Sequence, residues 1–352
     1  MSQDSVSTAR HSRKGLFGPL IVLGLLIAAW TGWWFYLAGQ VETRLAAQVE
    51  GLRRQGWDIR YQADGVSGWP FRVRLGLDQA VIGAPSGHAV SAPRLVAEAN
   101  AYDPTHWVVL APDGATLTRA AGKGQVGVTG EAIRMSVSGL NRRWPRLAIE
   151  LAGPVFTARG DAEAFPISRA ERIALEVRPH AAEGENKGGD DIDLLFQMAD
   201  AQGRMGGPVE GLAQQGRLSA RIETVIEDAD QLKGMDTAGV FAAWSRAGGR
   251  FTGVRGQLQA GESRATLTSD ALAAGPDGRL EGQLALRAEK PLPAIAGLAR
   301  SGSGAVNRMG AAGAAAATAA GGGQGDIDLT LVFRDGRTFL GPFALAPAPK
   351  LF

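Results

Sequence analysis

Three histidines and one serine are the first candidates for chemistry in this chain. Histidine is the commonest metal ligand and general base, and a serine between glycines can mark a nucleophile elbow. His88, His106 and His180 have no histidine or carboxylate partner at the spacing that a metal site needs. Ser67 stands in GVSGW, one glycine out of register with the elbow motif. We expect surface or strand-end positions for these residues and no catalytic role.

Two short acidic groups could bind a cation or supply paired carboxylates. They are Asp190, Asp191 and Asp193, and Glu227, Asp228 and Asp230. Neither group has the spacing of a calcium loop, and acidic residues at strand ends are usually part of solvated turns. The sequence therefore predicts no metal, no cofactor and no enzymatic activity.

Composition narrows the classes of partner. The chain has 352 residues, no cysteine, and 37 Lys and Arg against 35 Asp and Glu. A nucleic-acid-binding surface normally concentrates its basic residues, and no dense Lys/Arg run is present. The absence of cysteine removes disulfides and thiolate metal sites. We therefore expect no nucleic-acid partner.

The strongest single signal is a long apolar run near the N-terminus. Residues 16–38 carry no charge, and a helix of this length can cross the hydrocarbon core of a bilayer. Four aromatic residues near its end are of the kind that favours a membrane interface. These expected interface residues are Trp30, Trp33, Trp34 and Tyr36.

Charge flanking the run predicts its orientation. Arg10, Arg13 and Lys14 precede it, so the positive-inside bias predicts a cytoplasmic tail over residues 1–15 and a periplasmic remainder. The alternative is a cleaved signal peptide, but Tyr36 and Leu37 occupy the positions where cleavage needs small residues. We expect an uncleaved, single-pass anchor in a bacterial inner membrane.

A second helix is expected over residues 39–56, continuing the anchor and docking on the first strands. Val41, Leu45, Val49 and Leu52 share one helical face, and Gly56 can end the helix. Coiled-coil pairing is the alternative, but two heptads are too few to support it.

Beyond residue 57, alternation of apolar and polar residues indicates antiparallel sheet with one covered and one exposed face. The pairs Asp113-Gly114, Asp277-Gly278 and Asp335-Gly336 predict turns. We expect strands over 71–77, 146–151, 172–177, 217–226, 264–269, 279–289 and 326–333.

The stretch GWPFRVRL, residues 68–75, places an aromatic-proline pair at the head of a strand. Proline cannot donate to a central ladder, so Pro70 fits a strand start or an edge. Trp144 and Pro145 repeat the pair before another strand. We expect a structural cap or an apolar groove, formed by Trp69, Pro70, Phe71, Val73, Leu75, Trp144 and Pro145.

Helices are expected as interruptions of the sheet. Residues 236–247 and 291–300 have helical patterns, the first closed by Gly248-Gly249. Residues 301–325 consist almost entirely of small residues and predict a flexible Gly/Ala-rich insertion, with a loosely helical insertion as the alternative.

The order of these features resembles a known family. The anchor, GVSGWPFRVRL, the segment from Trp244 to Leu286 and the closing GRTFLGPFALAPAP are similar to the uncharacterised alphaproteobacterial family called domain of unknown function 2125. No catalytic residues follow from this resemblance. The stretch SDALAAGPDGRLEGQLAL is also distantly similar to AsmA-like envelope proteins, whose long curved sheets hold lipid acyl chains on an apolar face.

Together these patterns predict a mainly β (α+β) protein. A transmembrane helix precedes a large curved antiparallel sheet with a few packed helices, forming one β-rich domain over residues 57–352. An apolar face that helices do not cover needs another occupant. We expect noncatalytic binding or transfer of a lipid or another amphiphile in envelope maintenance; the alternatives are a periplasmic scaffold for a membrane protein partner and, third, an envelope hydrolase.

Overall fold

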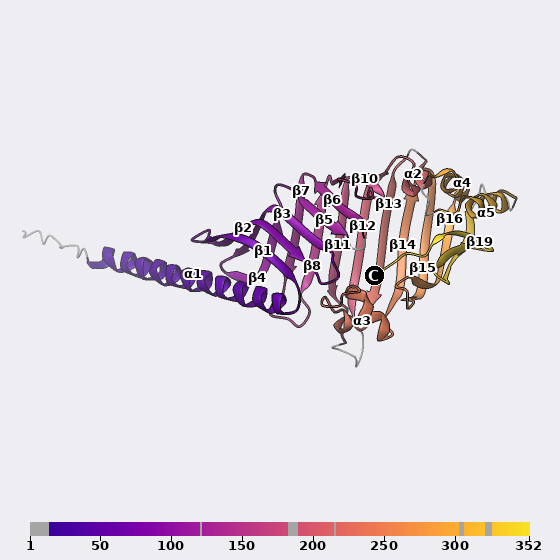
Figure 1. Ribbon diagram of the computed structural model, residues 1–352. Helices are drawn as coiled ribbons and strands as arrows, with labels where there is room; N and C mark the ends of the chain where they lie inside the picture. The colour runs from indigo at the N-terminus through magenta and orange to yellow at the C-terminus, as the bar shows by residue number, and fades with distance from the viewer. Residues whose placement is uncertain (1–13, 120–121, 182–188, 215, 303–305, 321–325) are drawn as a thin grey trace, which may run out of the picture.

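The computed structural model describes residues 14–119, 122–181, 189–214, 216–302, 306–320 and 326–352. Its main feature is one sheet of 19 strands, in which every pairing is antiparallel. A long N-terminal helix projects from one end of this sheet, and short helices lie along its margins (Figure 1). The predicted fold class, mainly β with a few packed helices, is confirmed.

The second half of the sheet is a simple meander, because each strand pairs with the next one along the chain. Asp277-Gly278 and Asp335-Gly336 form two of its turns, and each of these glycines has a positive φ. The strands are β13 (Leu218–Ile226), β14 (Arg250–Ala260), β15 (Ser263–Ala274), β16 (Leu280–Glu289), β17 (Asp326–Arg334), β18 (Arg337–Leu340) and β19 (Phe343–Pro347).

The first half of the sheet has a crease. One edge of β3 pairs with β4 near its end and with β5 near its beginning, and β12 pairs in the same way with β11 and β10. The strands are β1 (Asp58–Ser67), β2 (Arg72–Gly83), β3 (Ala89–Asn100), β4 (Asp103–Leu110), β5 (Ala115–Arg119), β6 (Gly124–Thr129), β7 (Ala132–Ser138), β8 (Arg146–Ala152), β9 (Val155–Arg159), β10 (Ile167–Arg169), β11 (Arg172–Pro179) and β12 (Ile192–Gly203).

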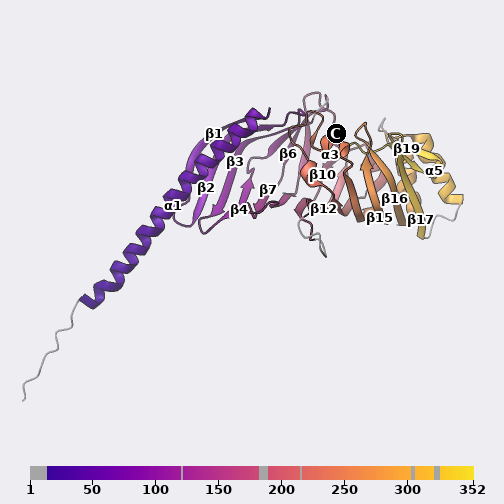
Figure 2. The same ribbon diagram turned by 90° about the horizontal axis from the view of Figure 1, so that it is seen from below.

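Four strand pairs, β4/β5, β6/β7, β8/β9 and β10/β11, are therefore long strands broken at the crease. Hydrogen bonds continue across it: the Glu131 amide donates to the Ala152 carbonyl at 2.9 Å, and the Gly153 amide donates to the Glu171 carbonyl at 2.7 Å. At Gly130 a Cβ would lie 2.6 Å from the Ala152 oxygen, so the bend needs glycine there. Viewed from below, the sheet does not lie in one plane (Figure 2).

Helices cover only parts of the sheet. Val209 and Leu212 of α2 pack on Leu218 and Ala260, whereas Trp244 of α3 packs on the cluster that contains Ile226. The helices are α1 (Lys14–Arg54), α2 (Pro208–Ala213), α3 (Val240–Arg246), α4 (Pro291–Arg300) and α5 (Arg308–Ala320), with a 3₁₀ turn at Ala229–Gln231.

Helix α1 combines the expected anchor and juxtamembrane helix in one continuous element, which ends before Gly56 (φ +89°). Among the described residues, it is the helix long and apolar enough to cross a membrane. Its N-terminal half stands free of the sheet, and its C-terminal half lies along the first strands (Figure 2). Val49 is buried, and Val41 packs on the cluster around Trp34, so the predicted docking face does contact the sheet.

Part of the Gly/Ala-rich tract is helical, which favours the helical alternative over a flexible tether for these residues. Arg308–Ala320 forms α5, because alanine is the strongest helix former. Ala311 and Ala314 are buried beside Leu340 and Leu345. The parts of the tract at 303–305 and 321–325 lie outside the described residues.

Candidate functional site

The residues first considered for chemistry do not converge. His88 Nδ1 lies 3.1 Å from Ser86 Oγ, and the Ser67 hydroxyl donates to the Arg74 carbonyl at 3.4 Å. His180 does have a carboxylate partner, since its Nδ1 lies 2.5 Å from Asp193 Oδ1, but this pair is at the surface. Within the residues that the structure describes, no group of three or more His, Asp or Glu side chains could hold a metal ion.

The acidic groups make structural contacts around the strand ends. Asp190 pairs with Arg143 at 2.6 Å and accepts a hydrogen bond from the Trp144 indole at 3.2 Å. Asp191 accepts the backbone amide of Asp228 at 3.0 Å. The Asp190 carboxylate therefore ties the β11–β12 region to the β7–β8 loop, and the Asp191 carboxylate ties it to the 3₁₀ turn.

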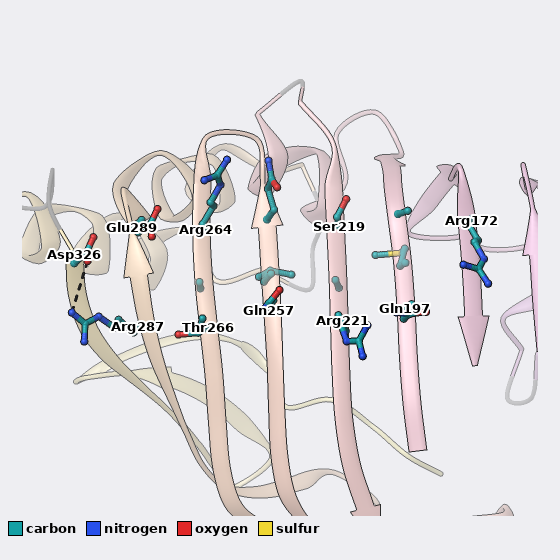
Figure 3. Close-up of a pocket in the computed structure, with 16 residues that line it drawn as sticks. Arg172, Gln197, Ser219, Arg221, Gln257, Arg264, Thr266, Arg287, Glu289 and Asp326 are labelled. Atoms are coloured by element: carbon teal, nitrogen blue, oxygen red, sulfur yellow. Dashed lines mark ion pairs between the residues drawn. The ribbon is translucent and has the colours of Figure 1, made fainter. Parts of the chain in front are cut away.

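The polar face of the sheet has a shallow depression of about 490 Å³ over β11–β17 (Figure 3). Its side chains come from neighbouring strands, and Arg287 approaches Asp326 at 3.9 Å. The labelled residues are Arg172, Gln197, Ser219, Arg221, Gln257, Arg264, Thr266, Arg287, Glu289 and Asp326. Because these side chains stand in parallel rows, they form a solvated strand surface with no convergent catalytic pair.

One carboxylate on this face is clearly perturbed. Glu150 of β8 accepts hydrogen bonds from Arg134 at 2.6 Å and from Arg172 at 2.8 Å. The Arg134 hydrogen bond is the largest cause that lowers the pKa of Glu150, and partial burial opposes it. The result is a three-residue ion network that ties β7, β8 and β11 together.

The opposite face is apolar over most of its width. Strand register places side chains of successive strands in rows, because directly paired residues point to the same side. The central row crosses from β2 to β13 and consists of Leu75, Ala97, Val109, Met135, Ile149, Leu175, Phe196 and Ile222.

Two flanking rows extend this apolar face. One runs through Val73, Ala99, Trp107, Val137, Leu147, Val177 and Leu194. The other runs through Ile133, Leu151, Ile173, Met198, Ala220 and Leu258. The face is therefore three side chains deep where the sheet crosses β7, β8 and β11.

Helices cover the two ends of these rows, and within the described residues no helix packs on the middle. Trp34 of α1 packs with Val73 and Trp107, whereas Trp144 and α3 pack around Val177 and Leu194. Beyond the crease, Phe156 and Phe165 stack at 4.6 Å and pack with Ile173 and Met198 on the same side. Figure 2 shows α1 and α3 along one side of the sheet.

Between these covers lies a set of side chains that we call the apolar floor. Its members are half-buried, as expected for side chains that touch only their lateral neighbours, and they belong to no buried cluster among the described residues. The apolar floor consists of Val109, Ile133, Met135, Val137, Leu147, Ile149, Leu151, Leu175 and Phe196. It spans five adjacent strands, or about 19 Å at the usual strand separation.

The structure divides the predicted strand-cap residues into two groups. Val73 and Leu75 are buried on the apolar face, and Trp144 and Pro145 precede β8 at the edge of the α3 cluster. Trp69 and Phe71, expected to plug the near end of that face, are instead 53% and 64% exposed. They lie in the turn before β2, where their backbone leaves the ladder.

The four aromatic residues predicted for a membrane interface differ in exposure and in their contacts with the sheet. Trp34 is buried in the protein, and its indole donates to the Arg72 carbonyl at 2.7 Å. Trp30 and Trp33 donate to the carbonyls of Pro70 and Ala101, at 2.8 and 3.3 Å. Tyr36 is exposed. The Trp34 side chain therefore faces the sheet and helps to fasten α1 to it, and the interface position of these four residues stays a prediction.

Sequence reasoning missed most of the apolar floor. It predicted β8 and β11, but not β4 or β7. The signal in β7 was the alternation of Ile133, Met135 and Val137 with polar neighbours. No local pattern reveals which strands lie between the helices, since this depends on long-range pairing.

Comparison with known proteins identifies a family for this chain. A family model described as an uncharacterized protein conserved in bacteria, DUF2125, matches residues 34–349. The chain belongs to the DUF2125 family. No curated protein and no solved structure matches it. The likeness to AsmA-like envelope proteins is not shown by these comparisons and stays an expectation.

Proposed function

We propose that this DUF2125 protein is a membrane-anchored, noncatalytic protein that binds or transfers a lipid or a similar amphiphile. The observation that carries the proposal is the apolar floor, which the described part of the chain leaves uncovered between α1 and α3. Such a large apolar surface is rarely left to water in a soluble domain and marks an interaction site.

The dimensions of the apolar floor suit an acyl chain. Its span of about 19 Å exceeds half of the hydrocarbon core, about 15 Å, which is the depth that one lipid leaflet occupies. Each buried methylene contributes about 0.8 kcal/mol. Contacts along the floor can therefore hold an acyl chain without any charged partner.

The proposed location is the bacterial inner membrane. Helix α1 anchors the chain in a bacterial inner membrane, with Arg10, Arg13 and Lys14 on the cytoplasmic side and the sheet in the periplasm. The family description, a protein conserved in bacteria, supports a bacterial membrane, and the charge distribution supports this orientation. A sheet tethered beside a bilayer has a constant supply of lipid.

Purification of the full chain in a lipid-free detergent, followed by native mass spectrometry, tests the proposal. We expect bound species with lipid masses and saturable uptake of a fluorescent fatty acid. Recovery of ligand-free protein that takes up no acyl probe would reject lipid binding. Capture of a single stoichiometric membrane protein by crosslinking, with no lipid, would instead support the scaffold alternative.

A further inference from the structure

The free part of α1 is too short to cross a bilayer by itself. The helix first contacts the sheet at Trp30, whose indole donates to the Pro70 carbonyl. Residues 16–30 rise by about 22 Å as a helix, whereas the hydrocarbon core is about 30 Å thick. Leu37 and Ala38 cannot complete the span facing lipid, because they are buried against the sheet.

Exposed aromatic residues lie beside the point where the helix meets the sheet. Trp69, Phe71 and Tyr102 are 53%, 64% and 69% exposed. With Leu26, Ile27, Trp30 and Pro70 they line an open, almost wholly apolar hollow of about 700 Å³. We call Trp69, Pro70, Phe71 and Tyr102 the aromatic tips, since they occupy the turns that end β1 and β3.

We propose that the aromatic tips insert into the periplasmic leaflet and complete the short membrane span. A bilayer that covers residues 16–36 would match a helix length of about 31 Å. The tips, level with residues 26–30, would then lie inside the periplasmic leaflet, about 9–15 Å below the edge of the apolar layer. Their apolar rings suit that layer, and the polar N–H and O–H groups of Trp69 and Tyr102 can point toward its edge.

The charges around the tips fit this depth. Arg72 directly follows the tips and is largely exposed, although it also pairs with Glu98 at 3.2 Å. It would reach the phosphate layer while Phe71 enters the apolar layer. A lipid is the occupant that fits, because one wall of the hollow is the free segment of α1, which itself lies in the bilayer.

Insertion of the tips would also bring the apolar floor close to the membrane. Trp107 lies about 17 Å along β4 from Tyr102 at the usual rise per residue, and it is paired with Val137 of the floor. Insertion of the tips into the leaflet therefore places the near end of the apolar face against the bilayer. This inference rests on the proposed membrane anchoring and adds how the sheet meets the membrane.

The chain has no cysteine, so single cysteines can carry an environment-sensitive fluorophore at chosen positions. We would label Phe71→Cys and Tyr102→Cys in the full chain, reconstituted in nanodiscs whose lipids carry nitroxides at a shallow or a deep acyl position. Leu25→Cys reports the span, and Met205→Cys, 88% exposed at the end of β12, reports the aqueous domain.

We expect blue-shifted emission at positions 71 and 102 and several-fold stronger quenching by lipid nitroxides than at position 205. Lipid quenching at position 25 alone, with the tips accessible to aqueous iodide, would reject insertion of the tips and leave the anchoring by α1 intact. Absence of lipid quenching at all four positions would reject both insertion of the tips and membrane anchoring by α1. Tips shielded from both quenchers by a copurifying protein would also overturn the proposal.

Discussion

At the scale of single residues, Ile149 and Ala148 are neighbours on β8 with opposite surroundings. Ile149 lies in the central apolar row beside Met135 and Leu175, whereas Ala148 points to the polar face. Both are half-buried, so each offers space for a larger side chain. Substitutions at these two positions therefore compare the apolar and polar faces of the sheet within a single strand.

We predict that Ile149→Arg lowers the affinity for an acyl probe at least tenfold, because it places a charge on the apolar floor. Ala148→Arg adds the same side chain on the polar face and is expected to leave affinity unchanged. Titration with a fluorescent fatty acid measures both, with circular dichroism as the folding control. Met135→Trp, which fills the floor without adding charge, should also weaken binding. Equal affinities in all three variants would contradict the role of the floor.

Glu150 makes stability depend on pH. Its folded-state pKa is lowered, mainly by the hydrogen bond from Arg134. The stabilisation by its carboxylate is therefore complete above the pKa of the unfolded chain and is lost as the pH falls through the lowered folded-state pKa.

We predict that Glu150→Gln lowers stability at pH 7 by about 1 kcal/mol or less, since the pair is only partly shielded from water. The difference from the original chain should disappear on acidification below the folded-state pKa. Thermal melts across this pH range measure it. A difference that stayed constant with pH would show that the ion network is not its cause.

At the scale of elements, sequence patterns predicted the regular strands well. The segments expected at 146–151, 172–177, 217–226, 279–289 and 326–333 correspond to β8, β11, β13, β16 and β17. Alternation identifies these strands because one side of each is apolar and the other faces water. It could not identify the crease, because breaks at Gly130 and Gly153 resemble ordinary loop glycines.

Helix α5 shows why composition misled the prediction for part of the Gly/Ala-rich tract. Small side chains are typical of flexible linkers, but here they allow close packing. A Cβ on Gly313 would lie 2.6 Å from the Phe343 ring, and one on Gly310 would lie 1.9 Å from the Ala344 oxygen. The glycines therefore allow α5 to approach β19 closely.

We predict that Gly313→Leu destabilises the docking of α5 by about 1–3 kcal/mol through overpacking. In an undocked α5 the same change would stabilise the helix, because leucine is a far better helix former than glycine. Hydrogen exchange over residues 308–320 measures the outcome. Ala316→Leu, on the exposed side of α5, is the matched control and should leave exchange unchanged. Slower exchange in Gly313→Leu would contradict the docked arrangement.

At the scale of the whole molecule, one sheet extends from the anchor helix to α5, and its helices cover only parts of the apolar face (Figure 1). The sequence predicted the apolar face itself. It could not predict where that face stays open, because the order β4–β7–β8–β11–β12 depends on strand pairings between distant segments. The candidate site therefore required the structure.

Site-specific photocrosslinking in living cells tests the central claim most directly. A photoreactive amino acid at position 149 lies on the apolar floor, and the same residue at position 148 lies on the polar face. We predict that illumination attaches a lipid to position 149 and not to position 148, detected as a lipid-mass adduct on the intact protein. A protein adduct at position 149, or equal lipid adducts at both positions, would contradict lipid binding on the apolar floor.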